Sequence, residues 1–127
     1  MLARVSTSAD TFVIWHNPRC SKSRQTLARL EQAGVTPTVR RYLDDPPSAA
    51  ELRTAAARLE GGAAALIRRK EALFKSLGLA DALKAGDDDA LLTAMATHPR
   101  LIERPLVQRG ERAVLGRPPE NVDALLA

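Results

Sequence analysis

The strongest constraint on the fold of this chain is a short apolar run that leads directly into a turn and then into a helical pattern. The run covers residues 11–15 (TFVIW), and an Asn-Pro pair at 17–18 marks its end. From residue 21, leucine and alanine recur at helical spacing until Gly34 provides a C-terminal stop. Residues 38–43 alternate as a second strand. A strand, a helix and a strand in this order predict a βαβ unit with two parallel strands.

The middle of the chain is predicted to be helical. Ser48 followed by Glu51 forms a capping box, which opens a helix that ends near residue 59. The alanine- and leucine-rich stretch 63–97 is expected to form three short helices, because glycines interrupt it. Residues 1–10 are expected to be a flexible N-terminal segment.

The C-terminal part predicts a β-hairpin and a last helix. Apolar runs at 106–108 and 113–115 flank an Arg-Gly-Glu turn, and a helix is expected from about 118 to 126. This order of elements resembles the thioredoxin-like architecture, an α/β fold in which a mixed sheet of about four strands has flanking helices. We expect residues 11–127 to form a single domain of this kind, with a helical insertion at about 63–97.

Charge and cysteine content limit the classes of function. The net charge of +4 and the pI near 9.8 alone would suggest a nucleic-acid partner. The basic residues are dispersed and the aromatic residues are few, so we expect no nucleic acid and favour a small anion. One cysteine cannot form an internal disulfide, and we find neither a signal peptide nor a membrane-spanning run. We therefore expect a cytoplasmic protein that binds no membrane and no metal.

The single cysteine, Cys20, lies at the junction between the first strand and the first helix. Unpaired backbone N–H groups and the helix dipole stabilise a thiolate at such a position, which lowers the thiol pKa. Arg19, Lys22 and Arg24 would add to this effect if their side chains point inward. His16 could donate a hydrogen bond or, if protonated, supply a charge, but it could equally be a structural residue that ends the strand.

An inert role for Cys20 has to be weighed, because most lone cysteines are buried core residues. A core residue is expected inside an apolar run. Cys20 instead has Pro-Arg before it and Ser-Lys-Ser-Arg after it. We therefore interpret Cys20 as a reactive thiol.

The segment HNPRCSKSRQTL, residues 16–27, resembles the active-site segment of the glutaredoxin-coupled arsenate reductases. That family is thioredoxin-like and has the pattern His-Asn-Pro-x-Cys-x-x-Ser-Arg. The resemblance continues, in order, through YLDDPPS at 42–48, ALIRRKEALFKSLGL at 65–79, HPRLIERPLV at 98–107 and LGRPPENV at 115–122. These blocks span nearly the whole chain from residue 12, which makes a chance similarity untenable.

The resemblance implies roles for the residues around the thiol. Cys20 matches the nucleophile of the family, and His16 matches the histidine that tunes it. Ser23 and Arg24 match the Ser-Arg pair that follows the nucleophile, so Ser23 is expected to be a catalytic residue together with Cys20 and His16, and Arg24 is expected to help bind the substrate. Ser23 also occupies the second position of a Cys-x-x-Cys motif, so disulfide exchange within the chain is excluded.

Three more arginines match the residues that bind the oxyanion in this family, namely Arg68, Arg104 and Arg117. Most arginines in proteins are solvated surface residues, so each could also have no role in the site. Members of the family are similar in having a cis proline at the position of Pro105, which would direct Arg104 into the pocket. Planar guanidinium groups suit arsenate because they bind tetrahedral oxyanions through pairs of N–H donors.

The mechanism that the resemblance implies is reduction of arsenate to arsenite in arsenic detoxification. The Cys20 thiolate attacks arsenate, and a covalent thiol–arsenate adduct forms. Glutathione resolves the adduct as a co-substrate, and glutaredoxin recycles the mixed disulfide. We expect that the protein binds no cofactor and that it is a monomer.

A hypothesis of another class remains open. The chain could be a non-catalytic or redox-regulatory thioredoxin-like binding module that docks on a partner protein such as RNA polymerase. Such a module has no reason to keep three guanidinium groups that converge on a thiol. The arginines therefore favour the enzyme.

Overall fold

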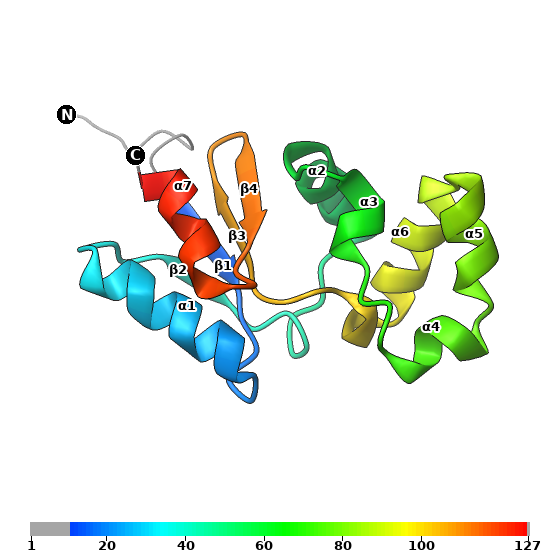
Figure 1. Cartoon of the computed structure of the whole chain (residues 1–127), viewed down its shortest axis with the longest axis horizontal. Helices are drawn as coiled ribbons and strands as arrows, with labels where there is room; N and C mark the ends of the chain where they lie inside the picture. The colour runs from blue at the N-terminus through cyan, green and yellow to red at the C-terminus, as the bar shows by residue number, and fades with distance from the viewer. Residues whose placement is uncertain (1–10, 127) are drawn as a thin grey trace. The chain divides into compact units, whose positions relative to one another are not determined.

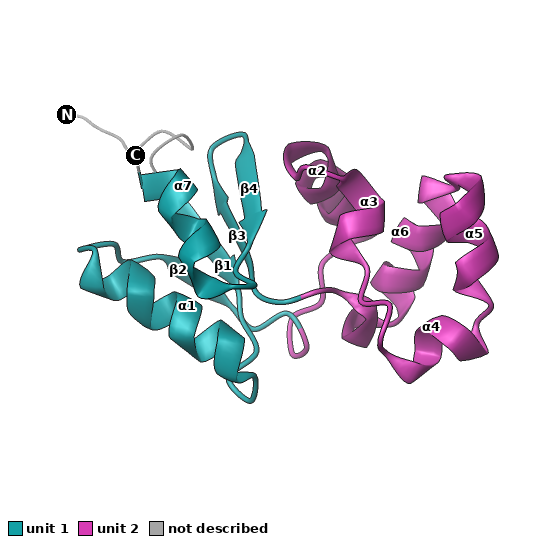
Figure 2. Cartoon of the chain, viewed as in Figure 1, with its two compact units in different colours: residues 1–42, 104–127 teal, residues 43–103 magenta. Residues whose placement is uncertain are grey.

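The computed structural model describes residues 11–126 of the chain (Figure 1). The chain divides into two compact units, of which the first comprises residues 1–42 and 104–127 and the second comprises residues 43–103 (Figure 2). The segment 1–10, for which we expected flexibility, lies outside the described residues. The single domain over residues 11–127 stays a prediction.

The first unit contains a mixed sheet of four strands with helices beside it, as the sequence predicted. Its strands are β1 (Phe12–Trp15), β2 (Thr38–Arg40), β3 (Leu106–Arg109) and β4 (Arg112–Leu115), and its helices are α1 (Ser21–Gln32), the 3₁₀ helix η4 (Pro119–Val122) and α7 (Asp123–Leu126). The strand order is β2-β1-β3-β4. β1 and β2 are parallel, whereas β1–β3 and β3–β4 are antiparallel, which confirms the predicted βαβ unit and hairpin.

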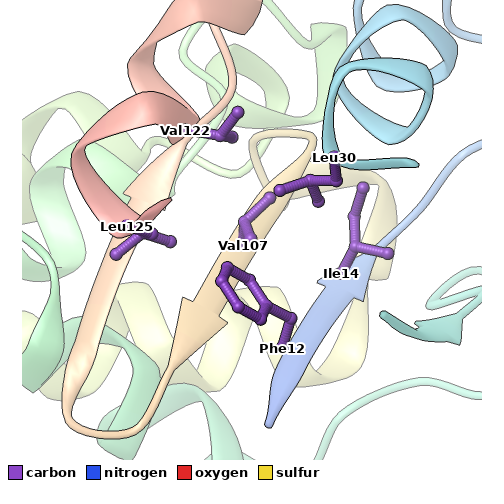
Figure 3. Close-up of a cluster of buried hydrophobic side chains, with 6 residues drawn as sticks. All are labelled: Phe12, Ile14, Leu30, Val107, Val122 and Leu125. Atoms are coloured by element: carbon purple, nitrogen blue, oxygen red, sulfur yellow. The ribbon is translucent and has the colours of Figure 1, made fainter. Parts of the chain in front are cut away.

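One face of this sheet is covered by α1 and the C-terminal helices. The alternation of β1 directs Phe12 and Ile14 to the same face, because side chains in a strand alternate between its two sides. They form a buried cluster with Val107 of β3, Leu30 of α1, Val122 of η4 and Leu125 of α7 (Figure 3). Complete burial of one such leucine is worth about 1.5–3 kcal/mol. This cluster holds α1 in a defined position against the sheet.

The second strand is shorter than the sequence predicted. The alternating pattern extends over 38–43, but only Thr38–Arg40 pairs with β1. β1 ends at Trp15, whose partner is Arg40, so the chain beyond Arg40 has no strand to pair with. The end of β2 is therefore set by the length of β1. The residue pattern of β2 alone cannot reveal that length.

The second unit is helical. Its helices are α2 (Ala49–Arg58), α3 (Gly62–Leu66), α4 (Ala72–Ser76), α5 (Leu79–Ala85), α6 (Asp88–Thr97) and the 3₁₀ helix η3 (Pro99–Leu101). α6 contacts α2, α3, α5 and η3, so it is the central helix of the unit. The predicted capping box of α2 is present, since the Ser48 side chain accepts from the Glu51 N–H and Glu51 accepts from the Ser48 N–H.

The stretch 63–97 was expected to form three helices, and this prediction was wrong because α3, α4, α5 and α6 all lie in it. The unforeseen break separates α3 from α4 and contains neither glycine nor proline. It coincides with an isolated β-bridge between Ile67 and Ile102. The Arg68 N–H donates to the Leu101 carbonyl, and the Glu103 N–H donates to the Leu66 carbonyl. A contact with a distant part of the chain therefore ends α3.

Within residues 11–126, none of the helices combines the length and the apolar character that crossing a membrane would require.

Candidate active site

The topology of the sheet brings three chain segments to one of its edges. β1 ends at Trp15, which is paired with Leu106 at the start of β3. Leu106 is in turn paired with Leu115 at the end of β4. Three segments therefore meet at this edge. The segment after Trp15 leads to Cys20, the segment before Leu106 contains Arg104, and the segment after Leu115 contains Arg117.

Two of the predicted arginines lie next to the thiol. The Gly116 N–H donates to the Pro105 carbonyl, which extends the β3–β4 pairing by one residue. Arg104 and Arg117 follow as the next pair, and Arg117 Nη1 donates to the Arg104 carbonyl at 3.3 Å. The same Nη1 lies 3.8 Å from the Cys20 Sγ. The Arg104–Pro105 peptide is cis, as the resemblance implied, and Arg117–Pro118 is also cis.

Cys20 is the N-cap residue of α1, with extended backbone angles and a partly buried side chain. Burial raises the pKa of the thiol, but the backbone N–H groups of Ser23 and Lys22 and the guanidinium groups of Arg104 and Arg117 lower it. The net result is a pKa below the ordinary value for cysteine. Because Cys20 is the N-cap residue, its side chain lies at the positive end of the α1 dipole, which can stabilise a thiolate there.

The side chain of His16 contacts Ser23 in the first turn of α1. Its Nδ1 lies 2.7 Å from the Ser23 Oγ, and both side chains are buried. The Ser23 Oγ also accepts a hydrogen bond from the Asn17 N–H at 3.0 Å. Burial, followed by the charges of Arg41 and Arg24, lowers the pKa of His16, which favours the neutral form of its ring. The Ser23 hydroxyl thus connects the end of β1 with the first turn of α1, and the role of His16 in tuning the thiol stays a prediction.

The basic residues adjacent to Cys20 in sequence are exposed, and the role of Arg24 in substrate binding stays a prediction. Arg24 Nη1 donates to the Pro18 carbonyl at 2.8 Å, which restrains the loop that leads to Cys20. Arg19 and Lys22 have exposed side chains. The guanidinium groups that lower the thiol pKa come from Arg104 and Arg117, which are more than 80 residues away in the sequence.

Arg68 belongs to the second unit, where it follows α3. Its Nη1 lies 3.2 Å from Oε2 of Glu71, and its side chain is 32% exposed. The convergence of Arg68 with Arg104 and Arg117 on one oxyanion stays a prediction.

Thr26 and Gly116 support the site, although sequence reasoning did not single them out. The buried Thr26 Oγ1 donates to the Lys22 carbonyl at 2.8 Å and also lies 3.2 Å from the Gly116 carbonyl. A Cβ atom at Gly116 would lie 2.8 Å from Cγ of Pro105 and 2.8 Å from Cγ2 of Thr26. Only glycine allows the segment before Arg117 to approach α1 this closely.

The lowered pKa of Cys20 predicts that its reactive thiolate forms at a lower pH than that of an ordinary cysteine. Alkylation by iodoacetamide requires the thiolate, so its rate should fall as the pH falls through the pKa of the folded protein. We expect this midpoint to lie below the free-cysteine value of about 8.5. The same titration in denaturant provides the control, because it reports the same thiol without the fold. Coincident midpoints in the two titrations would contradict the stabilisation of the thiolate by α1 and the two arginines.

Among residues 11–126, no three histidine, cysteine, aspartate or glutamate side chains gather in a way that could hold a metal ion. What the site provides is a nucleophilic sulfur beside two guanidinium groups, an arrangement suited to attack on an anion.

Comparison with known protein families matches residues 15–125 to the ArsC family. The chain belongs to the ArsC family. Its curated relatives include the arsenate reductase of Neisseria meningitidis serogroup A, which is 46% identical over 114 residues that cover 89% of this chain and 96% of that protein. The arsenate reductase of Haemophilus influenzae is 44% identical over 115 residues, which cover 90% of this chain and 97% of that protein.

Solved structures agree with this assignment. The arsenate reductase from Vibrio cholerae is 48% identical and superposes with a TM-score of 0.82, covering 92% of this chain and 98% of that one. The predicted thioredoxin-like α/β fold is therefore confirmed.

Proposed function

We propose that this protein is an arsenate reductase in which the Cys20 thiolate is the nucleophile. The observation that carries the proposal is the position of Cys20, which is the N-cap residue of α1 and whose sulfur lies 3.8 Å from a guanidinium nitrogen of Arg117. The lowered pKa of this thiol, to which Arg104 also contributes, favours the reactive form. Relatives named arsenate reductase, which match this chain over most of its length, support the choice of substrate.

Arginine is the residue that this reaction requires around the thiol. Arsenate is a tetrahedral oxyanion, and negative charge accumulates on its oxygens when a thiolate attacks the arsenic. The planar donor sets of Arg104 and Arg117 can bind these oxygens in pairs and disperse the charge. We propose Arg68 as the third arginine of this set and Arg24 as a further contributor to substrate binding. His16 and Ser23 hold the loop that presents the sulfur.

The proposed reaction has three steps. The Cys20 thiolate attacks arsenic, a sulfur–arsenic bond forms, and one arsenate oxygen leaves as water after protonation. The thiolate of glutathione then attacks the Cys20 sulfur, so that a disulfide forms, the sulfur–arsenic bond breaks, and its electron pair remains on arsenic, which leaves as arsenite. A glutaredoxin thiolate finally attacks the glutathione sulfur of this disulfide. A disulfide between glutaredoxin and glutathione forms, and the Cys20 thiolate is released. Overall, two thiols lose two electrons and As(V) becomes As(III).

The cysteine content of the sequence indicates that the proposed reaction needs thiols from other molecules. Cys20 is the one cysteine in the 127 residues, so the thiols that resolve the adduct come from other molecules. We propose glutathione as the co-substrate and glutaredoxin as the protein partner. We further propose that the protein acts as a monomer in the cytoplasm, where thiols are kept reduced.

A coupled assay tests this proposal. Arsenate should cause consumption of NADPH when the protein is mixed with glutathione, glutaredoxin and glutathione reductase. Omission of glutaredoxin should remove the arsenate-dependent NADPH consumption, and so should omission of glutathione. These two omissions identify the reductant. A correctly folded protein that causes no arsenate-dependent NADPH consumption with any thiol donor would contradict the proposal and would favour the non-catalytic binding module.

A further inference from the structure

Glu71 is a buried carboxylate that two arginines share. Its side chain is 9% exposed, which is uncommon for a glutamate unless its charge is paired. Oε2 lies 3.2 Å from Nη1 of Arg68, and Oε1 lies 2.7 Å from Nη2 of Arg100. Each carboxylate oxygen therefore binds a different guanidinium group.

The backbone around Arg68 is held as firmly as its side chain. The Arg68 N–H donates to the Leu101 carbonyl at 2.6 Å, next to the bridge between Ile67 and Ile102. The Arg68 carbonyl in turn accepts from the Glu71 N–H at 3.3 Å. With the backbone fixed on both sides, the contact with Glu71 decides the direction of the guanidinium group.

This contact occupies only part of the donor set of Arg68. In the described chain, no other protein group accepts a hydrogen bond from the Arg68 side chain, so its Nε and Nη2 N–H groups remain for a ligand. The side chain is 32% exposed, so a small anion can reach it. A guanidinium group that is held at one nitrogen and open at the others is suited to oriented binding of an oxyanion.

We propose that Glu71 is a positioning residue, which orients the Arg68 guanidinium group for the oxyanion and is itself held in place by Arg100. This inference rests on the proposed function, because it assigns a role to a residue behind one of the proposed oxyanion ligands. Glu71 does not touch the substrate. Its effect passes through Arg68.

Charge and geometry predict opposite results when the carboxylate is removed. Glu71→Gln keeps the shape of the side chain but removes one negative charge beside two cations, so the local charge becomes more positive. If charge alone mattered, arsenate would bind more tightly. If Glu71 orients Arg68, the loss of the ion pair frees the guanidinium group and weakens productive binding.

The test measures steady-state kinetics of arsenate reduction with Glu71→Gln. We expect kcat/KM for arsenate to fall by about tenfold, mainly through a higher KM, because a binding group has lost its orientation. Asp89→Asn is the matched control, since it removes the carboxylate of the exposed Arg53–Asp89 pair in the same unit. The control should retain wild-type kinetics. Circular dichroism at the assay temperature verifies that both variants are folded.

A double-mutant cycle separates positioning from a merely structural role. In an Arg68→Ala background, Glu71→Gln should cause no further loss of kcat/KM, because the residue through which it acts is gone. Losses that multiply in the double variant would overturn the inference, as would unchanged or tighter arsenate binding in Glu71→Gln. If the wild-type protein reduces arsenate, either of these variant results would overturn the role of Glu71 but leave the arsenate reductase proposal intact. An inactive wild-type protein would instead contradict that proposal itself.

Discussion

Replacing Cys20 with serine is expected to abolish arsenate reduction and to leave the fold intact. A serine hydroxyl is hardly ionised near neutral pH, so α1 and the two arginines would have no anionic nucleophile to stabilise. We expect kcat/KM in the coupled assay to fall by at least about a thousandfold. Cys20 is the N-cap residue of α1, and serine is a favourable N-cap, so thermal stability should be unchanged or raised.

The same variant separates chemistry from binding. Arg104 and Arg117 are unchanged in Cys20→Ser, so the variant should still bind arsenate, as measured by isothermal titration calorimetry. Retained binding without turnover would identify Cys20 as the nucleophile rather than as a binding group. Activity within tenfold of the wild-type value would show that another group attacks the arsenic, and would refute the proposed mechanism.

Arg104→Lys is expected to have the second largest effect. Lysine keeps the positive charge beside the thiol but loses the planar, two-pronged set of donors, and its flexible stem does not hold one orientation. If Arg104 binds the oxyanion through paired hydrogen bonds, kcat/KM for arsenate should fall by about ten- to a thousandfold, or about 1.4–4 kcal/mol. The hydrogen bond from Arg117 to position 104 should persist, because it uses the backbone carbonyl.

The thiol pKa provides an independent readout of the charge. The guanidinium group of Arg104 helps to lower the pKa of Cys20, so the alkylation midpoint should stay low in Arg104→Lys and rise in Arg104→Ala. Arg112→Lys is the matched control, because Arg112 lies at the opposite, turn end of the same hairpin. Wild-type activity in Arg104→Lys would show that charge alone suffices. Wild-type activity in Arg104→Ala would remove Arg104 from the site.

Local patterns in the sequence identified most of the elements that build the site. The apolar run of β1, the Asn-Pro turn and the helical pattern from residue 21 placed Cys20 at the start of a helix, and the structure agrees. The capping box of α2 and the hairpin at 106–115 were likewise recognisable, because each depends on residues only a few positions apart. The resemblance to a family, rather than any periodicity, singled out the arginines.

Other features depend on contacts between distant segments and were therefore beyond the reach of local patterns. The bridge between Ile67 and Ile102 divides a helical stretch that has no breaker residue, and the end of β1 limits β2 to three residues. The position of Glu71 between two arginines shows the same dependence. Its spacing from Arg68 is visible in the sequence, whereas its contact with Arg100 exists only in the fold.

The sequence by itself determined that one thiol begins a helix, since helix propensity and turn chemistry act over a few residues. Only the tertiary structure decided which cations face that thiol. The neighbours in sequence, Arg19 and Lys22, have exposed side chains, while the sheet register brings Arg104 and Arg117 to the sulfur. The physical reason is that the electrostatic field at an atom depends on distance in space, and a sheet sets that distance by pairing strands that lie far apart in the chain.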